Sequence, residues 1–302
     1  MESMHLRLNR TFQLIQEADY IIVGAGAGLS AAAGFDYSGK RFNDIFLDFK
    51  DKYRIEDMYS GSFYSFSSEE EKWAYWARFV KCNTFDTQPT LLYQKLLKLI
   101  QDKDYFVVTT NTDNQFEING FDMSRYFETQ GNFKYFQCQK GCHRKVYQDQ
   151  KLIQFMVHQT KDCKIPTSLV PKCPYCHGNM DIHVRKNAHF VETKGWEHYC
   201  RNYERFLKKA LKRKVVFLEF GVGFNTPSII RYPFERMTYQ HKNCSLIRFN
   251  KDYPFIIKGI ENRMIAFDEN IEDILTHLLE VKENERKRTF KAHERKTLLS
   301  SI

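Results

Sequence analysis

Long hydrophobic runs are absent from this sequence of 302 residues. No apolar stretch approaches the roughly 20 residues that cross a bilayer as a helix, and the N-terminal sequence MESMHLRLNRTF lacks the apolar segment of a secretory signal. Internal repeats and low-complexity linkers are also missing. With 42% hydrophobic and 27% charged residues, the composition is that of a globular chain. We therefore expect a soluble, cytoplasmic protein without a membrane partner.

The sequence also lacks basic motifs with interleaved aromatic residues, which are typical of nucleic-acid-binding modules. Nucleic acid is therefore an unlikely partner, although the formal charge of +9 suggests an acidic one. This charge is uneven. Residues 281–302 hold seven Lys or Arg against three Glu, and a second basic cluster runs from Arg201 to Lys214. Both clusters are typical of solvated surfaces, and we expect the tail after Leu279 to be loosely ordered.

A glycine-rich turn follows the first apolar strand of the sequence. Residues 20–34 read YIIVGAGAGLSAAAG, in which a strand leads into a turn of glycine and alanine and then into small residues suited to opening a helix. Glycines let the backbone approach a phosphate closely, and the N–H groups of a first helical turn point at it. The segment therefore predicts a site for a phosphorylated cofactor.

One expected feature of a nicotinamide dehydrogenase does not follow this turn. Gly26 to Ala31 fits the general dinucleotide pattern, but a dehydrogenase places a second parallel strand ending in Asp or Glu about 20 residues further on. Asp48 lies at about that distance, in a helix-like pattern with Ile45, Phe46 and Phe49. A dehydrogenase is therefore the least favoured alternative.

The eight cysteines fall into two classes. The paired cysteines are Cys138 with Cys142 and Cys173 with Cys176, and the isolated ones are Cys82, Cys163, Cys200 and Cys244. Four thiolates complete a tetrahedral zinc with ligands at about 2.3 Å, and they leave no position open for water. We therefore predict a structural zinc held by the paired cysteines, with His143 or His177 as alternative ligands. A reducing compartment disfavours disulfides, and CPYC lacks the strand-then-helix context of a redox site.

Strand and helix patterns alternate outside the cysteine-rich region, as in a doubly wound parallel sheet. The expected strands are 20–23, 105–110, 125–127, 215–220, 244–249 and 264–267, and the expected helices are 6–16, 70–80, 90–101, 199–212 and 270–279. We therefore predict an α/β fold.

Four parts of the chain are expected. A doubly wound, parallel-sheet Rossmann-like domain for the phosphorylated cofactor would comprise residues 1–42, 85–135 and 195–280. Residues 43–84, dense in aromatic side chains, would form a helical insertion that folds over the glycine turn. Residues 136–194 would form an inserted zinc-ribbon lobe with little core of its own, and residues 281–302 a basic tail.

Separated motifs occur along the chain in one order. They are Gly26-Ala27-Gly28-Leu29-Ser30, Thr109-Thr110-Asn111-Thr112-Asp113, Glu128-Thr129-Gln130-Gly131 and the two cysteine pairs. This series resembles the sirtuin family of NAD-consuming enzymes, and the likeness covers nearly the whole chain. Gly221-Val222-Gly223 stands where sirtuins carry Gly-Thr-Ser, and Phe249-Asn250 where they carry Ile-Asn beside the adenine ribose. The resemblance implies NAD as co-substrate and a structural Zn2+.

The resemblance also implies roles for single residues. Asn111 would hydrogen-bond the reacting ribose, Asp113 would hold the nicotinamide carboxamide, and Gln130 completes the catalytic set. Further NAD contacts are implied for Gly26, Ala27, Gly28, Ser30, Arg41, Thr110, Gly221, Val222, Gly223, Asn225 and Asn250. An Asn or Asp after a strand often only caps a turn, but the two together in TTNTD, at the end of a core strand, favour a functional role.

Two departures separate the chain from sirtuin deacylases. Gln130 occupies the position of their histidine base, and glutamine cannot accept a proton there. Their Pro-Asp-Phe-Arg is replaced by Phe35-Asp36-Tyr37-Ser38-Gly39-Lys40-Arg41-Phe42. FDYSGKRF, ETQG and LEFGVGFNTP closely resemble the macrodomain-linked (class M) bacterial sirtuins. That resemblance implies a protein ADP-ribosyltransferase acting on a lipoylated carrier related to the glycine-cleavage H protein, and a macrodomain protein that reverses the modification.

The leading hypothesis is thus an NAD-dependent protein mono-ADP-ribosyltransferase. An NAD-dependent lysine deacylase is the second hypothesis, with another group in place of the missing histidine. A third is a non-catalytic nucleotide sensor whose zinc lobe and basic tail dock a partner. If the carrier is acidic, the basic residues between Arg201 and Lys214 would steer it.

Overall fold

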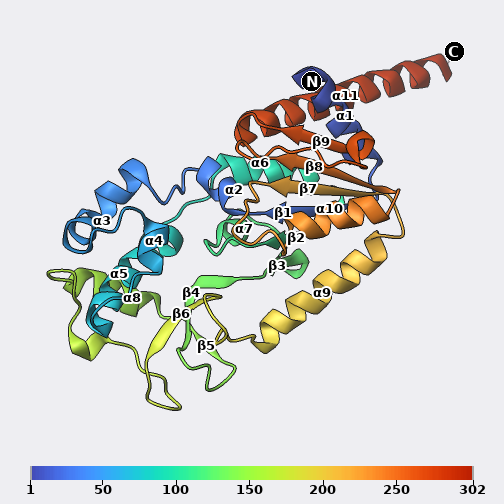
Figure 1. Ribbon diagram of the computed structural model, residues 1–302. Coiled ribbons are helices and arrows are strands. Elements are labelled where there is room, and N and C mark those ends of the chain that lie inside the picture. Colours follow the sequence, from blue (N-terminus) through green and yellow to red (C-terminus); the bar gives the residue numbers. More distant parts are fainter. Residues whose placement is uncertain (1, 301–302) are drawn as a thin grey trace. The chain divides into compact units, whose positions relative to one another are not determined.

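The computed structural model describes residues 2–300, and the side chains of residues 2–287 (Figure 1). The chain forms two compact units. The sheet unit comprises Met1–Ala33, Thr90–Val108 and Tyr203–Ile302, and the cysteine unit comprises Gly34–Pro89 and Thr109–Asn202. The boundaries predicted above for domains stay a prediction.

The sheet unit is built on a sheet with the strand order β2-β1-β7-β8-β9, in which β1, β7, β8 and β9 pair in parallel. Their bounds are β1 Tyr20–Ala25, β2 Asp104–Thr109, β7 Val215–Phe220, β8 Cys244–Phe249 and β9 Met264–Phe267. In the parallel register, Val215 of β7 pairs with Tyr20 of β1 and with Cys244 of β8. Every residue of β1 and β7 is buried, as expected of strands covered by helices on both faces.

Helices lie on both sides of this sheet, with α11 on one side and α10 on the other (Figure 1). The helices of this unit are α1 Met4–Glu17, α2 Ala27–Ala32, α6 Leu91–Ile100, α10 Arg231–Gln240 and α11 Ile271–Ser300, and α9 Lys194–Ala210 spans both units. The predicted doubly wound fold is confirmed. Helix α10 was not predicted, because Pro233 interrupts the pattern, but a proline is tolerated in a first helical turn.

Helix α11 corrects the expectation of a loosely ordered tail after Leu279. The helix continues to Ser300. The buried Lys282 fastens it to the end of α6, because its ammonium donates to the carbonyls of Lys98 and Leu99 and to the Asp102 carboxylate at 2.9 to 3.0 Å. No side chain beyond residue 287 and no backbone of residues 301–302 is among those described. Within the described part, none of the helices combines the length and apolarity needed to cross a bilayer.

The cysteine unit combines helices with a small antiparallel sheet. Its helices are α3 Gly39–Tyr53, α4 Met58–Ser62, α5 Glu69–Val80, α7 Gln115–Ile118 and α8 Gln150–Gln159. The antiparallel sheet consists of β4 Gly131–Cys138, β5 Val146–Tyr147 and β6 Met180–Val184, and β3 Tyr126–Glu128 is not one of its strands. Strands β5 and β6 flank β4. A π-helical turn, Lys81–Phe85, follows α5.

One aromatic core joins the helical insertion to the cysteine-rich lobe. The ring centroids of Trp73 and Phe136 lie 5.2 Å apart, and those of Phe79 and Phe133 lie 4.8 Å apart. The same buried cluster contains Ile153 of α8. The lobe therefore shares its core with the insertion, to which α5 and the unpredicted α8 both contribute, and the expectation that it has little core of its own stays a prediction. That the insertion covers the glycine turn stays a prediction.

Candidate functional site

In the sheet unit, three loops meet where β1, β7 and β8 end. The Gly26 amide donates to the Phe220 carbonyl at 2.9 Å, and the Gly28 amide donates to Gly221 at 2.9 Å. The Gly221 amide in turn donates to Phe249 at 2.8 Å. The predicted glycine turn and the predicted Gly221 segment are therefore bound to each other at the carboxyl edge of the sheet, where parallel sheets place their ligands.

Close packing explains why glycines occupy these loops. A Cβ atom on Gly26 would lie 2.8 Å from the Gly221 oxygen, and one on Gly28 would lie 2.7 Å from the Gly221 Cα. Gly221 has a φ of +57°, and its own Cβ would lie 2.3 Å from the Leu29 amide nitrogen. A Cβ on Gly223 would meet nothing within 4 Å. Three glycines are thus needed to bring the loops together, and Gly223 is not.

Other predicted contacts in this unit have internal partners. The buried Ser30 hydroxyl lies 3.3 Å from the Tyr93 hydroxyl. The Asn250 amide donates to the Val222 carbonyl at 2.8 Å, and its oxygen accepts from the Tyr253 amide at 3.0 Å. Ala27 is exposed, as is Asn225. Asn250 therefore joins the loop after β7 to the loop after β8.

Four charged side chains lie directly beneath these loops. Glu219 of β7 and Arg248 of β8 are register partners, and their two hydrogen bonds measure 2.7 and 3.0 Å. Arg248 also donates to Glu235 of α10 at 2.5 Å, and Arg231 lies 3.6 Å from both carboxylates. This ion network was not predicted from the sequence. A signal was present, since Glu219 and Arg248 each interrupt an otherwise apolar strand.

In the cysteine unit, two predicted motifs are bound to each other. The Thr109 carbonyl accepts from the amide and the hydroxyl of Thr129, at 2.9 and 3.0 Å. The Asn111 amide donates to the Thr109 hydroxyl at 3.0 Å, and the Phe133 amide donates to the Thr112 carbonyl at 3.1 Å. The TTNTD loop and the ETQG segment, which carry the predicted catalytic residues, therefore lie side by side.

The polar side chains of these motifs are largely buried. Asn111 is 8% exposed and Asp113 is 4% exposed. One Asp113 oxygen accepts from the Gln115 amide at 3.1 Å, so this residue does cap a turn. Burial, reinforced by the negative charge of Asp113, raises the pKa of Tyr37. The Gln130 side-chain oxygen is buried and has no hydrogen-bond partner among the described residues, which is costly unless a ligand supplies a donor.

Glu128 is the titratable group of the ETQG segment. Burial of the carboxyl raises its pKa to about 7. Hydrogen bonds from Asn132 at 2.9 Å and Tyr126 at 3.1 Å act in the opposite direction and lower the pKa. Lys134 of β4 donates a further hydrogen bond, to the Asn114 side-chain oxygen at 3.2 Å. The start of β4 is thereby connected to the residue that follows Asp113.

The segment that replaces Pro-Asp-Phe-Arg has a defined structure. The Arg41 guanidinium donates to the carbonyls of Asp36 at 3.1 Å and Cys82 at 2.9 Å. Phe42 is fully buried in the aromatic core. Phe42 is therefore a core residue, whereas Arg41 is half-buried and connects the start of α3 to the π-helical turn.

The paired cysteines come together in the cysteine unit. The sulfurs of Cys138 and Cys176 lie 3.6 Å apart, as do those of Cys142 and Cys173. Sulfurs on a tetrahedral zinc with bonds of about 2.3 Å lie about 3.8 Å from each other. These distances are consistent with a zinc site.

His143 is also part of this cluster. The ligand atoms of Cys138, Cys142, His143 and Cys173 all lie within 4.8 Å of one another, and the His143 Nδ1 is 3.1 Å from the Cys142 sulfur. Among the described residues, His177, the other alternative, is not part of this group. The cluster therefore offers a nitrogen ligand beside its thiols.

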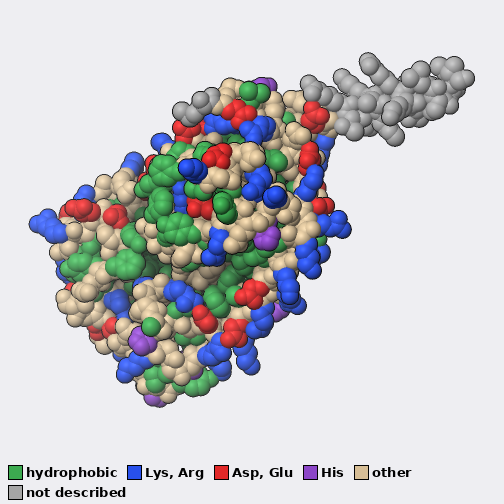
Figure 2. Space-filling model, turned by 45° about the vertical axis from the view of Figure 1, so that its right-hand side comes forward, with side chains coloured by type: hydrophobic (Ala, Val, Ile, Leu, Met, Phe, Trp, Pro, Cys, Tyr) green, Lys and Arg blue, Asp and Glu red, His purple; other side chains and the backbone are tan. Residues whose placement is uncertain are grey.

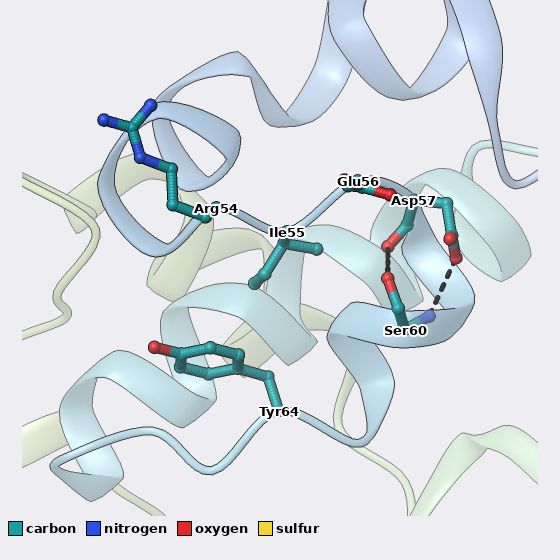
Figure 3. A pocket seen from close by; sticks show the side chains of 6 residues that line it. All are labelled: Arg54, Ile55, Glu56, Asp57, Ser60 and Tyr64. Carbon is teal, nitrogen blue, oxygen red and sulfur yellow. Dashed lines mark hydrogen bonds between the residues drawn. The ribbon is translucent and has the colours of Figure 1, made fainter.

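A separate pocket of about 250 Å3 opens in the cysteine unit between the end of α3 and α4 (Figure 3). Its lining residues are Arg54, Ile55, Glu56, Asp57, Ser60 and Tyr64. Asp57 caps α4 by accepting from the Ser60 amide at 2.8 Å. Figure 3 shows the Arg54 guanidinium pointing away from this carboxylate. None of the predicted site residues lines the pocket.

The chain is similar to solved structures of Sir2 proteins. A Sir2 homologue in complex with NAD matches with a TM-score of 0.57 and 16% identity, over 90% of this chain and 94% of that one. A mutant Sir2 homologue in complex with ADP-ribose matches with a TM-score of 0.56 and 14% identity, over 91% of this chain and 97% of that one. At such identities the likeness shows the fold, which is that of the Sir2 proteins, or sirtuins.

A protein relative decides the family. A protein ADP-ribosyltransferase of Staphylococcus aureus (strain Mu50) is 37% identical over 266 residues, which are 88% of this chain and 84% of that protein. The chain belongs to the sirtuin-like protein ADP-ribosyltransferases. A probable bifunctional ADP-ribose hydrolase/ADP-ribosyltransferase of Fusarium oxysporum f. sp. cubense is 32% identical over 243 residues, 73% of this chain but only 38% of that protein. No protein-family model matches the chain. The predicted family is thus confirmed.

Proposed function

We propose that this sirtuin-like ADP-ribosyltransferase uses NAD to attach one ADP-ribose to a side chain of a lipoylated carrier protein related to the glycine-cleavage H protein. The observation that carries the proposal is Gln130. It stands beside the TTNTD loop, where a deacylase would need a base, and it cannot accept a proton. A transferase needs no base to activate a ribose hydroxyl.

The reaction exchanges one glycosidic bond for another. The bond between the ribose C1′ and the nicotinamide nitrogen breaks, and nicotinamide leaves with the electron pair. A nucleophilic side chain of the acceptor then bonds to C1′ and loses its proton. Asn111 orients the ribose, and Asp113 holds the carboxamide. The unpartnered oxygen of Gln130 accepts a hydrogen bond from ribose or acceptor.

The loops of the sheet unit bind the rest of NAD. Gly26, Ala27, Gly28 and Ser30 hold the diphosphate, because the close-packed glycine turn presents backbone rather than side chains. In the same unit, Gly221, Val222, Gly223, Asn225 and Asn250 are further proposed NAD contacts, and Arg41 and Thr110 are proposed contacts from the cysteine unit. In the cysteine unit, Cys138, Cys142, Cys173 and Cys176 hold a structural Zn2+.

A reversing partner and a cytoplasmic location belong to the same proposal. The Fusarium relative is named as both an ADP-ribose hydrolase and a transferase, which supports a macrodomain protein that removes the modification. The four paired cysteines are thiols rather than disulfides. A reducing compartment keeps such thiols available for zinc.

Labelled NAD tests the proposal directly. The purified chain is incubated with NAD labelled in the ADP-ribose part and with a carrier in lipoylated and unlipoylated forms. We expect label on the lipoylated carrier together with released nicotinamide, and little on the unlipoylated one. Removal of acyl groups from lysine peptides at the rate of nicotinamide release, without label on protein, would instead identify a deacylase.

A further inference from the structure

Arg231 connects the two loops that carry predicted NAD contacts. It lies at the start of α10 and is 1% exposed. One guanidinium nitrogen donates to the Val222 carbonyl at 3.1 Å, and the other donates to the Tyr253 carbonyl at 3.0 Å. Val222 follows β7 and Tyr253 follows β8, so a single planar group spans both loops.

Asn250 makes a second connection between the same loops. Its amide donates to the Val222 carbonyl that Arg231 also uses, and its oxygen accepts from the Tyr253 amide. Both polar groups of the Tyr253 backbone are therefore engaged. The Phe224 ring lies 4.5 Å from the Arg231 guanidinium carbon and packs edge-on against the Tyr253 ring at 5.0 Å. Backbone carbonyls of both loops and the Phe224 ring therefore contact the buried Arg231 guanidinium.

The charge of Arg231 is balanced from below. Arg231 and Arg248 carry two positive charges, and Glu219 and Glu235 carry two negative ones. Arg248 fixes this set by its paired hydrogen bonds to Glu219 and by a further bond to the Phe255 carbonyl at 2.8 Å. A buried charge is tolerated when it is paired and hydrogen-bonded. The network therefore holds the guanidinium in one orientation.

We propose that Arg231 is a positioning residue for NAD. It does not contact NAD but holds the loops after β7 and β8 in the conformation that binds it. The inference rests on the function proposed above. A loop ordered before binding does not need to be ordered by the ligand, so loss of Arg231 weakens NAD binding. It leaves the glycosidic chemistry intact, because Asn111 and Gln130 belong to the other unit.

Three single variants separate positioning from stability. Arg231→Met removes the bridge, and Arg231→Lys keeps a charge that cannot span two carbonyls. Arg263→Met is the matched control. The Arg263 guanidinium also donates to carbonyls, those of Thr238, His241 and Cys244, but at the opposite end of β8. The readouts are the Kd for ADP-ribose by calorimetry, and kcat and KM for NAD in nicotinamide release.

We expect Arg231→Met to raise the Kd for ADP-ribose and the KM for NAD about 10- to 100-fold, the range for one or two lost charge-assisted hydrogen bonds. The kcat at saturating NAD should change little. The Kd and KM of Arg231→Lys should lie between those of Arg231→Met and those of the wild type. Arg263→Met should lower the unfolding midpoint and leave Kd and KM unchanged.

A charge-balanced double variant covers the case in which Arg231→Met folds poorly. Arg231→Met with Glu235→Gln removes one charge of each sign, so no buried carboxylate is left unpaired. It should recover stability and keep the raised Kd. If this stable double variant has the Kd and KM of the wild type, the positioning role of Arg231 is overturned. The proposed function would still stand as long as the wild type transfers ADP-ribose. A wild-type chain that binds neither NAD nor ADP-ribose would overturn the proposed function itself.

Discussion

The two units hold their functional loops by different means. In the sheet unit, the loops after β1, β7 and β8 leave adjacent parallel strands, and a buried network of four charges fixes them from below. In the cysteine unit, the TTNTD loop is bound to Thr129 and to Phe133 of β4, and the fold around it relies on aromatic rings and a thiol cluster. Strand β5 has only two residues.

This difference predicts different responses to damage. A parallel ladder buried on both faces fixes its strand ends even if one side chain is lost, so variants in the sheet unit should alter binding before they alter the fold. A three-stranded sheet supplies few backbone hydrogen bonds. The cysteine unit should therefore lose its fold when the thiol cluster is disrupted.

Loss of the metal should have the largest effect. We expect about one zinc per chain, and a structural zinc contributes directly to the free energy of folding. Cys173→Ser should abolish zinc binding and remove amide hydrogen-exchange protection from residues 131–184, while β1, β7 and β8 stay protected. Cys163→Ser is the control, because Cys163 is buried in the same core outside the cluster.

The expected difference between the units is contradicted if Cys173→Ser removes hydrogen-exchange protection equally from both units. Protein prepared without chelator that contains no zinc would contradict the metal site. Ligand identity can be tested with Co2+ as a probe, because its absorption distinguishes four thiolates from three thiolates and one nitrogen. Cys176→Ala should change that absorption and His143→Ala should not. The reverse result would make His143 the fourth ligand.

Asn111→Ala should have the next largest effect, and on chemistry rather than on folding. A lost positioning or transition-state contact costs about two to four orders of magnitude in rate, so transfer should fall by that factor. NAD binding through the sheet unit should largely survive. Asn119→Ala is a matched control, because Asn119 is also 8% exposed and donates to the Gln115 carbonyl at 2.7 Å. Equal losses in both variants would indicate a purely structural role for Asn111.

Glu128 should make the stability of the cysteine unit depend on pH. Its pKa is about 7 in the folded chain, above the ordinary 4.5, so folding favours the protonated carboxyl. The stabilisation is fully present below pH 4.5 and is lost as the pH rises through 7. Glu128→Gln keeps a neutral side chain. Urea unfolding should therefore show the variant gaining stability over the wild type between pH 5 and pH 8.

Glu197→Gln provides the contrast for this experiment. A hydrogen bond from Arg144 lowers the pKa of Glu197, and the side chain lies near the surface of the same unit. Its substitution should bring no gain at pH 8. A wild-type unfolding free energy that is flat from pH 5 to pH 8, with the variant parallel to it, would contradict the assignment of Glu128.

The sheet unit was largely predictable from sequence, because buried parallel strands are apolar runs that end at Gly or Asn. Segments such as YIIVGAG and VVFLEFG carry their own boundaries. The paired charges of Glu219 and Arg248 were visible in these runs, but only the strand register brings them opposite each other. Local patterns do not contain that register.

The cysteine unit was less predictable, because its core joins residues far apart in the chain. The cysteine spacing predicted the thiol cluster. Contacts such as that between Trp73 and Phe136 depend on tertiary packing, so the shared core was missed. The orphan oxygen of Gln130 likewise required the structure, although the sequence had already marked position 130 as unusual.

The smallest expected effect concerns encounter with the carrier and involves the basic end of α9. Lys208, Lys209 and Lys212 are exposed there, and Figure 2 shows Lys and Arg side chains along the right-hand margin of the face in view. An acidic carrier would be steered by such charges over about 10 Å at 0.1 M salt. Reversing all three to Glu should slow transfer several-fold at low salt, with the difference vanishing as ionic strength rises. The same reversal at Lys151, Lys161 and Lys172, exposed lysines of the cysteine unit, should leave transfer near the wild-type rate. Unchanged kinetics in the α9 variant would make this basic face merely solvated, and would confine recognition of the carrier to the site itself.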